Sequence, residues 1–132
     1  MSKNNILDFV ILGGGCSALS FINQVIEQKI TKYSFIIIEK QKKYADDKSW
    51  CFWSDNIKKT KNIIEASWNS FSFNLDNRTN FLSSTNFKYY YIRSIKFYEA
   101  IKKKISNYAH IKLKLNETII SITNKKNYYE VI

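Results

Sequence analysis

All three glycines of this 132-residue chain stand together, in the stretch FVILGGGCSALS. Glycine has no Cβ atom, so a cluster of glycines marks either a tight turn or a place where the backbone lies against another molecule. The cluster directly follows Phe9–Leu12, a short apolar run that is typical of a parallel strand buried on both faces. This combination limits the possible folds more than any other feature of the sequence.

The apolar residues after the glycines recur at helical spacing. The apolar side of this predicted amphipathic helix consists of Ala18, Leu19, Ile22, Val25 and Ile26. A short polar link then leads to SFIIIEK, a second predicted buried strand, which ends at Glu39. The order strand, glycine turn, helix, strand predicts a right-handed βαβ unit over residues 6–40.

Within this unit the glycines form the pattern G-x-G-x-x-A, made by Gly13, Gly15 and Ala18. In a dinucleotide-binding turn, the first position permits the tight turn, and the second lets a pyrophosphate approach bare backbone. The small third residue lets helix and strand pack closely. Free N–H groups and the helix dipole then hold the phosphates. The sequence therefore predicts an α/β fold with a Rossmann-type dinucleotide-binding domain.

The acid that ends the second strand limits the choice of cofactor. Glu39 is placed to accept a hydrogen bond from a ribose 2′-hydroxyl and would repel the 2′-phosphate of NADP. An ordinary solvated strand end is the alternative interpretation of this residue. The motif does not separate FAD from NAD, although its position at the start of the chain favours FAD. The predicted cofactor contacts are Gly13, Gly14, Gly15, Cys16, Ser17, Ala18, Glu39 and Lys40.

The second half of the chain alternates between strand and helix patterns. We expect the inward set of one strand to be Trp68, Phe71, Phe73 and Leu75. KYYYIRS predicts a further strand, and a helical stripe follows with Phe97, Ile101, Ile105 and Tyr108. The alternating tail pauses at residues 124–127, as a hairpin does. We expect one domain over residues 1–132, incomplete because the chain stops inside a strand pattern.

The chain is strongly basic, with a formal net charge of +10 from 21 Lys and Arg against 11 Asp and Glu. These bases spread along the whole sequence, so we favour a solvated lysine-rich surface over a functional basic patch. If such a patch exists, an anionic membrane surface suits it better than a nucleic acid. We therefore expect no nucleic-acid partner.

Two cysteines and a single histidine give no metal or nucleophile pattern. Cys16 and Cys51 form no C-x-x-C spacing, and His110 lies far from both in the sequence. We expect free thiols in a reducing cytosol and no metal site. No signal peptide is visible, and no apolar stretch is long enough for a membrane-spanning helix.

Four segments together resemble the N-terminal part of the lycopene cyclase family. They are DFVILGGGCSALS, FIIIEK, DDKSWCFW and YYYIRSIKFYEAI, and the resemblance covers nearly the whole chain. Many flavoproteins share the glycine motif, whereas Asp46–Trp53 is fairly specific to this family. The resemblance implies a fold like that of glutathione reductase or the FAD monooxygenases, here truncated.

The resemblance also implies an activity. Family members hold reduced FAD non-covalently and cyclise the end groups of lycopene to β-rings without net oxidation or reduction. The resemblance also suggests that the carotenoid lies along an apolar wall formed by Trp50, Phe52 and Trp53. Aromatic ring faces suit this role because they stabilise the positive charge that develops during cyclisation. Core packing is the alternative for these three. Arg93 would reach the flavin or its phosphates, or else face solvent. The expected location is cytoplasmic, peripheral to the inner face of the membrane.

The departures from the family limit these expectations. Family members are longer, and the residues that donate the proton would lie in a C-terminal portion that this chain lacks. No catalytic residue is assigned, because Asp46 and Asp47 are adjacent and nothing nearby indicates the burial that raises a pKa. We expect this chain alone to be inactive. Two alternatives to a lycopene cyclase stay open. The chain could belong to another FAD-dependent oxidoreductase, such as a monooxygenase or carotenoid desaturase. It could also be non-catalytic, either as a truncated product or as a basic module that binds membranes or nucleic acids.

Overall fold

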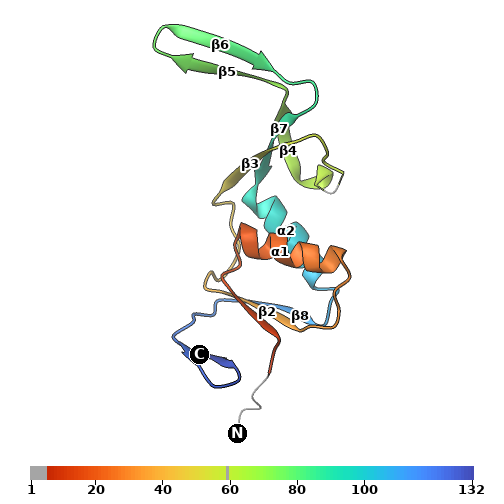
Figure 1. Ribbon diagram of the computed structural model, residues 1–132, viewed down its shortest axis with the longest axis vertical. Coiled ribbons are helices and arrows are strands. Elements are labelled where there is room, and N and C mark those ends of the chain that lie inside the picture. The colour runs from red at the N-terminus through yellow and green to blue at the C-terminus, as the bar shows by residue number, and fades with distance from the viewer. Residues whose placement is uncertain (1–5, 59) are drawn as a thin grey trace. The chain divides into compact units, whose positions relative to one another are not determined.

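A computed structural model describes residues 6–58 and 60–132, and Figure 1 shows the order of the elements. The first five residues of the predicted domain lie outside this described part. The chain divides into two compact units: Met1–Tyr44 with Tyr98–Ile132, and Ala45–Phe97. The second unit is thus inserted into the sequence of the first, a division that the sequence analysis does not anticipate.

The first unit contains a parallel sheet of three strands. These are β1 (Phe9–Leu12), β2 (Phe35–Glu39) and β8 (Ile111–Leu115), in the order β1-β2-β8. Helix α1 (Cys16–Glu27) connects β1 to β2, so the predicted order of strand, glycine turn, helix and strand is found. Phe21 of α1 contacts Phe35 of β2 edge to face, which places the helix against the sheet.

The core of this unit forms where the apolar patterns predict it. In the central strand β2, Phe35, Ile36 and Ile37 are buried, and α1 buries Leu19 and Ile22 completely. The prediction that β1 is buried on both faces is wrong. Its residues Phe9 and Leu12 are 44% and 49% exposed. The reason is topological: among the described strands, β1 pairs only with β2 and so lies at an edge of the sheet.

Helix α2 (Ser94–Ile105) carries three residues of the predicted helical stripe, Phe97, Ile101 and Ile105, all of them buried, and it ends before the fourth, Tyr108. Near its end, the Lys104 ammonium donates a hydrogen bond to Asn23 Oδ1 of α1 at 2.6 Å. The alternating tail separates into two structures. Its first part is β8 in the parallel sheet, and its second is a small hairpin of β9 (Ile122–Asn124) and β10 (Tyr129–Val131).

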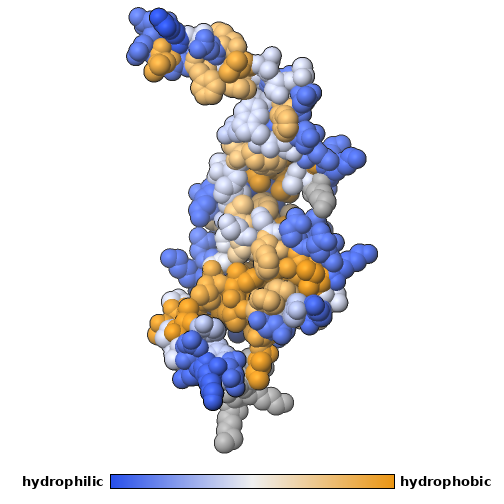
Figure 2. Space-filling model, in the orientation of Figure 1, coloured by the Kyte–Doolittle hydropathy of each residue, from blue (hydrophilic) through white to orange (hydrophobic). Residues whose placement is uncertain are grey.

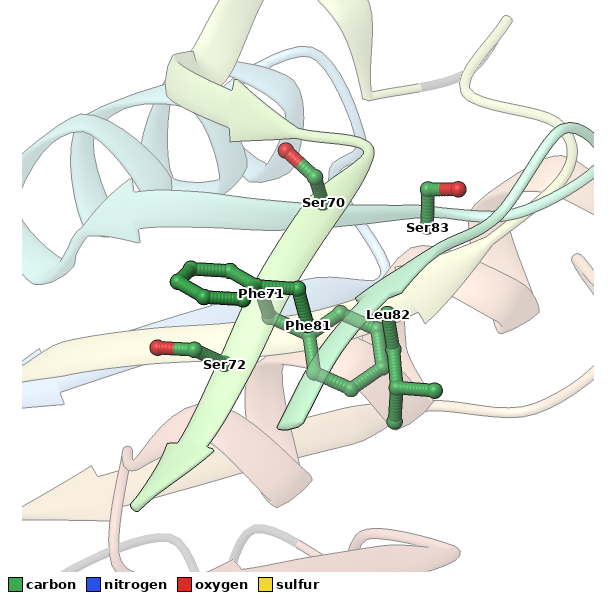
Figure 3. Close-up of a pocket in the computed structure, with 6 residues that line it drawn as sticks. All are labelled: Ser70, Phe71, Ser72, Phe81, Leu82 and Ser83. Atoms are coloured by element: carbon green, nitrogen blue, oxygen red, sulfur yellow. The ribbon is translucent and has the colours of Figure 1, made fainter. Parts of the chain in front are cut away.

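The second unit is antiparallel. Strands β3 (Ser49–Ser54), β7 (Lys88–Arg93) and β4 (Ile64–Trp68) form one sheet in the order β3-β7-β4, and a short 3₁₀ helix, η1 (Lys61–Ile63), precedes β4. Strands β5 (Ser70–Leu75) and β6 (Arg78–Ser83) form a separate hairpin. An open hollow of about 340 Å³ on this hairpin is lined by residues of both strands, as Figure 3 shows.

The strand expected around Trp68 to Leu75 is two strands, β4 and β5, and of the expected inward residues only Phe71 is half-buried. Phe73 is 63% and Leu75 is 75% exposed, because the hairpin has no second layer among the described residues. Figure 2 shows apolar side chains on the surface of this hairpin. No helix in residues 6–58 and 60–132 is long and apolar enough to cross a membrane.

Candidate dinucleotide-binding turn

The glycine turn joins the end of β1 directly to the start of α1. The Gly13 amide donates a hydrogen bond to the Ile38 carbonyl of β2 at 2.8 Å, which ties the turn to the neighbouring strand. The Gly15 carbonyl accepts the first helical hydrogen bond, from the Leu19 amide at 3.0 Å. The turn therefore lies at the carboxyl edge of the parallel sheet, where α/β folds bind their ligands.

The three glycines are needed for three different reasons. Gly13 has a φ of +86°, in the left-handed region that other residues rarely adopt. At Gly14 a Cβ atom would lie 3.1 Å from the Glu39 Cβ atom and would also collide with the Tyr44 hydroxyl. At Gly15 a Cβ atom would meet no protein atom within 4 Å. Gly15 therefore borders open space at the helix start, and no packing contact with other described residues accounts for its lack of a side chain.

The start of α1 suits an anion. Gly15 is the N-cap with extended backbone and no side-chain capping bond, and the first turn carries no acidic residue. The first N–H groups of a helix have no intrahelical partner, and they carry the positive end of the helix dipole. Ser17 is exposed and Cys16 and Ala18 are half-buried in this turn. Bare backbone, open space and an uncompensated helix end together fit the pyrophosphate of a dinucleotide.

Glu39, the predicted ribose partner, lies beside the glycine turn and is 9% exposed. Its Oε2 atom accepts a hydrogen bond from the Gly14 amide at 2.6 Å, and Oε1 accepts one from the Gln41 amide at 2.9 Å. An ionised carboxylate has about four acceptor positions, so these two bonds leave capacity for a ribose hydroxyl. The adjacent Lys40 is exposed. The cofactor contacts of both residues stay predictions.

Tyr44 is a part of this site that the sequence analysis misses. Its hydroxyl donates a hydrogen bond to the Gly14 carbonyl at 2.8 Å, although 30 positions separate the two residues in the sequence. Its ring stacks on Tyr98 with 4.1 Å between the centroids. Burial, followed by the nearby charge of Glu39, raises the pKa of the Tyr44 hydroxyl, so it stays a donor. A single tyrosine in a polar loop gives no sequence signal of this contact.

The aromatic residues of β3 do not form one wall. Trp50 and Phe52 share the half-buried face of the strand, where Trp50 contacts Phe97 and Phe52 stacks on Tyr90. Trp53 lies on the opposite face, because side chains alternate along a strand, and it is 46% exposed. The structure therefore separates the three residues that the sequence analysis groups together, and their substrate contacts stay predictions.

Arg93 is the last residue of β7, and α2 begins at Ser94. Its Nε atom donates to Asp46 Oδ2 at 2.6 Å, and the guanidinium forms an ion pair with the same carboxylate. This hydrogen-bonded pair holds the pKa of Asp46 below its usual value and raises that of Arg93. A carboxyl with a lowered pKa is a poor proton donor, which agrees with leaving Asp46 out of the catalytic residues.

The cysteines do not combine into another site. Cys16 and Cys51 are free thiols. In the part of the chain that the structure describes, no group of three or more His, Cys, Asp or Glu residues could hold a metal ion.

Comparison with known families gives the decisive observation. The family model described as "Lycopene cyclase protein" matches residues 8–132. The chain belongs to the lycopene cyclase family. This confirms the resemblance that the four sequence segments carry. A comparison with curated proteins gives no match.

Solved structures extend the comparison to the fold. The p-nitrophenol 4-monooxygenase PnpA from Pseudomonas putida matches 96% of this chain with a TM-score of 0.72 and 8% identity. PqsL, a probable FAD-dependent monooxygenase from Pseudomonas aeruginosa, matches 92% with a TM-score of 0.72 and 9% identity. CtdE, solved in complex with FAD, matches 97% with a TM-score of 0.63 and 12% identity.

These likenesses confirm the predicted fold class, an α/β Rossmann-like domain of the FAD-binding type. The identities are too low to carry function from those enzymes to this lycopene cyclase family member. The chain spans 36% of the length of PnpA, 36% of PqsL and 34% of CtdE. The likeness thus concerns about a third of each of those proteins.

Proposed function

We propose that this chain is the flavin-binding part of a lycopene β-cyclase, which closes the linear end groups of lycopene to β-rings. The family match over residues 8–132 is the observation that carries this proposal. The glycine turn supports it independently, because the open space at Gly15 adjoins an unpaired helix start.

The residues present fit FAD bound without a covalent link. Gly13–Ala18 would hold its pyrophosphate, and the Glu39 carboxylate would accept a hydrogen bond from its ribose. When bound in its reduced form, flavin supplies electron density that stabilises positive charge in a reaction without net oxidation or reduction. Lycopene is the proposed substrate, and a peripheral position at the inner face of the cytoplasmic membrane would give access to this hydrocarbon.

The chain alone is proposed to be inactive. It spans about a third of the length of the solved structures that it matches, and the Asp46 carboxyl, which pairs with Arg93, has a pKa below its usual value. Cyclisation needs an acid that protonates an end-group double bond, and such an acid needs a raised pKa to stay protonated near neutral pH. We therefore place the proton donor in further residues of a longer protein.

Two experiments test the two halves of the proposal. Titration of the purified chain with FAD should quench flavin fluorescence and saturate at one equivalent; no binding would overturn the flavoprotein assignment. The longest continuous reading frame that contains this chain should convert lycopene to β-carotene in a lycopene-accumulating bacterium, measured by pigment chromatography. In the same host, this chain alone should leave lycopene unchanged.

An FAD-dependent monooxygenase is the second candidate, because the solved structures with the same fold include such enzymes. It predicts that the longer protein consumes NAD(P)H and oxygen when substrate is present. A cyclase consumes neither in stoichiometric amounts. Measurement of oxygen uptake during pigment conversion separates the two candidates.

A further inference from the structure

The peptide bond between Gly14 and Gly15 is held from one side. Its carbonyl oxygen, on Gly14, accepts the hydrogen bond from the Tyr44 hydroxyl at 2.8 Å. All described peptide bonds are trans, so the N–H group of the same bond, on Gly15, points in the opposite direction. The contact with Tyr44 therefore determines where the Gly15 N–H group is directed.

The preceding peptide bond is held in the same region. Its N–H group, on Gly14, donates to Glu39 Oε2 at 2.6 Å. Both backbone polar groups of Gly14 are thus bound to side chains, one from the last residue of β2 and one from the loop after it. Rotation of either peptide would break a buried or partly buried hydrogen bond, which costs more than an exposed one because water replaces it less readily. The backbone of the turn is fixed before any ligand binds.

This arrangement has a consequence for an anionic ligand. A carbonyl oxygen that faced the open space at Gly15 would repel a phosphate, whereas an N–H group attracts it. The Tyr44 hydroxyl holds the Gly14 carbonyl away from that space. The ring of Tyr44 is itself held by stacking on Tyr98, with an interplanar angle of 13°.

We propose that Tyr44 is a positioning residue of the dinucleotide site, whose hydroxyl holds the Gly14 carbonyl so that the Gly15 N–H group faces the pyrophosphate. This inference rests on the proposed binding of FAD. Tyr44 itself contacts the turn rather than the cofactor.

The variant Tyr44→Phe tests the proposal because it removes the hydroxyl and keeps the ring that stacks on Tyr98. Loss of one hydrogen bond of this kind should weaken FAD binding by about 3- to 10-fold in a fluorescence titration. Tyr128→Phe is the matched control, since Tyr128 is 60% exposed and lies in the turn between β9 and β10. It should bind FAD as the wild type does.

The glycine content of the chain offers a second measurement that reports on the turn itself. All three glycines lie in the turn, so labelling with ¹⁵N-glycine gives an NMR spectrum of this segment. Tyr44→Phe should shift the Gly15 amide signal in the free chain and reduce its further shift on addition of FAD. Tyr128→Phe should leave the glycine signals in place.

A general loss of stability would give a different result. Tyr44→Leu removes both the stacking and the hydroxyl, so it should lower the urea midpoint, whereas Tyr44→Phe should barely change it. Unchanged FAD affinity together with unmoved glycine signals in Tyr44→Phe would overturn the proposal.

Failure of the proposed function would be visible separately. If the wild type binds no FAD, inorganic pyrophosphate serves as the probe of the turn. A shift of the Gly15 signal by pyrophosphate that Tyr44→Phe reduces would still support the positioning role. No response of the wild-type glycine signals to either ligand would overturn it.

Discussion

Gly14 and Gly15 are neighbours in one turn, yet a side chain would meet different surroundings at the two positions. A Cβ atom on Gly14 would press against Glu39 and the Tyr44 hydroxyl, whereas one on Gly15 would enter open space. The backbone of Gly15 has a φ of −76°, which any residue adopts without strain. Packing therefore requires glycine at position 14 but not at position 15, where the proposed ligand would require it.

Alanine substitutions separate these two requirements. Gly14→Ala should lower the free energy of unfolding by about 1–3 kcal/mol, because the new methyl group overpacks a buried contact. Gly15→Ala should lower stability by only about 1 kcal/mol, because alanine is a poorer N-cap than glycine but meets no clash there. It should nevertheless weaken FAD binding, since the methyl group occupies the space of the pyrophosphate. Urea denaturation and FAD titration measure the two effects. A folded Gly15→Ala variant with wild-type affinity would show that the ligand does not lie there.

At the scale of elements, apolar periodicity predicts where helices and strands form, because this depends on the local sequence. The strand at Phe35–Glu39 and the helix after the glycines follow from their patterns, and both are buried because β2 lies between β1 and β8 while α1 packs against the sheet. The alternation of Phe71, Phe73 and Leu75 correctly indicates a strand but wrongly indicates burial. Alternation shows that a strand has an apolar face, and it does not show what covers that face. The contact of Tyr44 with Gly14 cannot be predicted from periodicity either, because it depends on the path of the loop that carries Tyr44.

A contact between two elements of the second unit has a defined pH dependence. Asp46 precedes β3 and pairs with Arg93 at the end of β7, and this pairing holds the pKa of Asp46 below the usual 3.8. A carboxyl with a lowered folded-state pKa stabilises the fold above its unfolded pKa, and this contribution is lost as pH falls through the folded value. Stability from the pair should therefore be complete above about pH 4 and decline below it.

The variant Asp46→Asn measures this contribution. Its melting temperature should lie modestly below that of the wild type at pH 7, because both side chains are partly exposed and water screens the pair. The difference should shrink as the pH falls below 3.8 and through the lower pKa of folded Asp46, because the carboxyl becomes protonated over this range. Asp55→Asn, a change of the same charge at an exposed position, controls for net charge. An equal difference at pH 7 and pH 3 would contradict the role of the pair.

At the scale of the whole molecule, charge and exposed apolar surface both bear on the proposed membrane association. The formal net charge of +10 favours anionic surfaces in general. A series of ring contacts in the second unit links Trp68, Tyr89, Trp53, Phe71 and Phe73. The series begins with Trp and Tyr and ends with Phe. Membrane-bound proteins place side chains in the same order, with Trp and Tyr at the membrane–water interface and Phe in the hydrocarbon.

The pairing register of β5 and β6 places most of the large apolar side chains of this hairpin on one of its two faces. Phe71 pairs with Leu82, and side chains alternate along each strand, so Phe71, Phe73, Leu75 and Leu82 share one face, which we call the hairpin apolar face; Asn80 and Arg78 of β6 lie on it as well. Phe81 pairs with Ser72 on the opposite face and is 82% exposed. Phe73 and Phe81 are thus two exposed phenylalanines on different faces of the hairpin, 63% and 82% exposed.

If the proposed membrane association uses the hairpin apolar face, Phe73→Ser should reduce binding to anionic vesicles by about tenfold, since one large apolar side chain no longer leaves water. Phe81→Ser should bind like the wild type. Added salt should weaken binding of all variants, because it screens the attraction between the basic chain and the lipid. Vesicle sedimentation measures the bound fraction, and sedimentation velocity without lipid shows whether the face instead joins two copies of the chain. Equal loss from both faces, or loss of self-association alone, would mean that this side of the hairpin does not contact lipid.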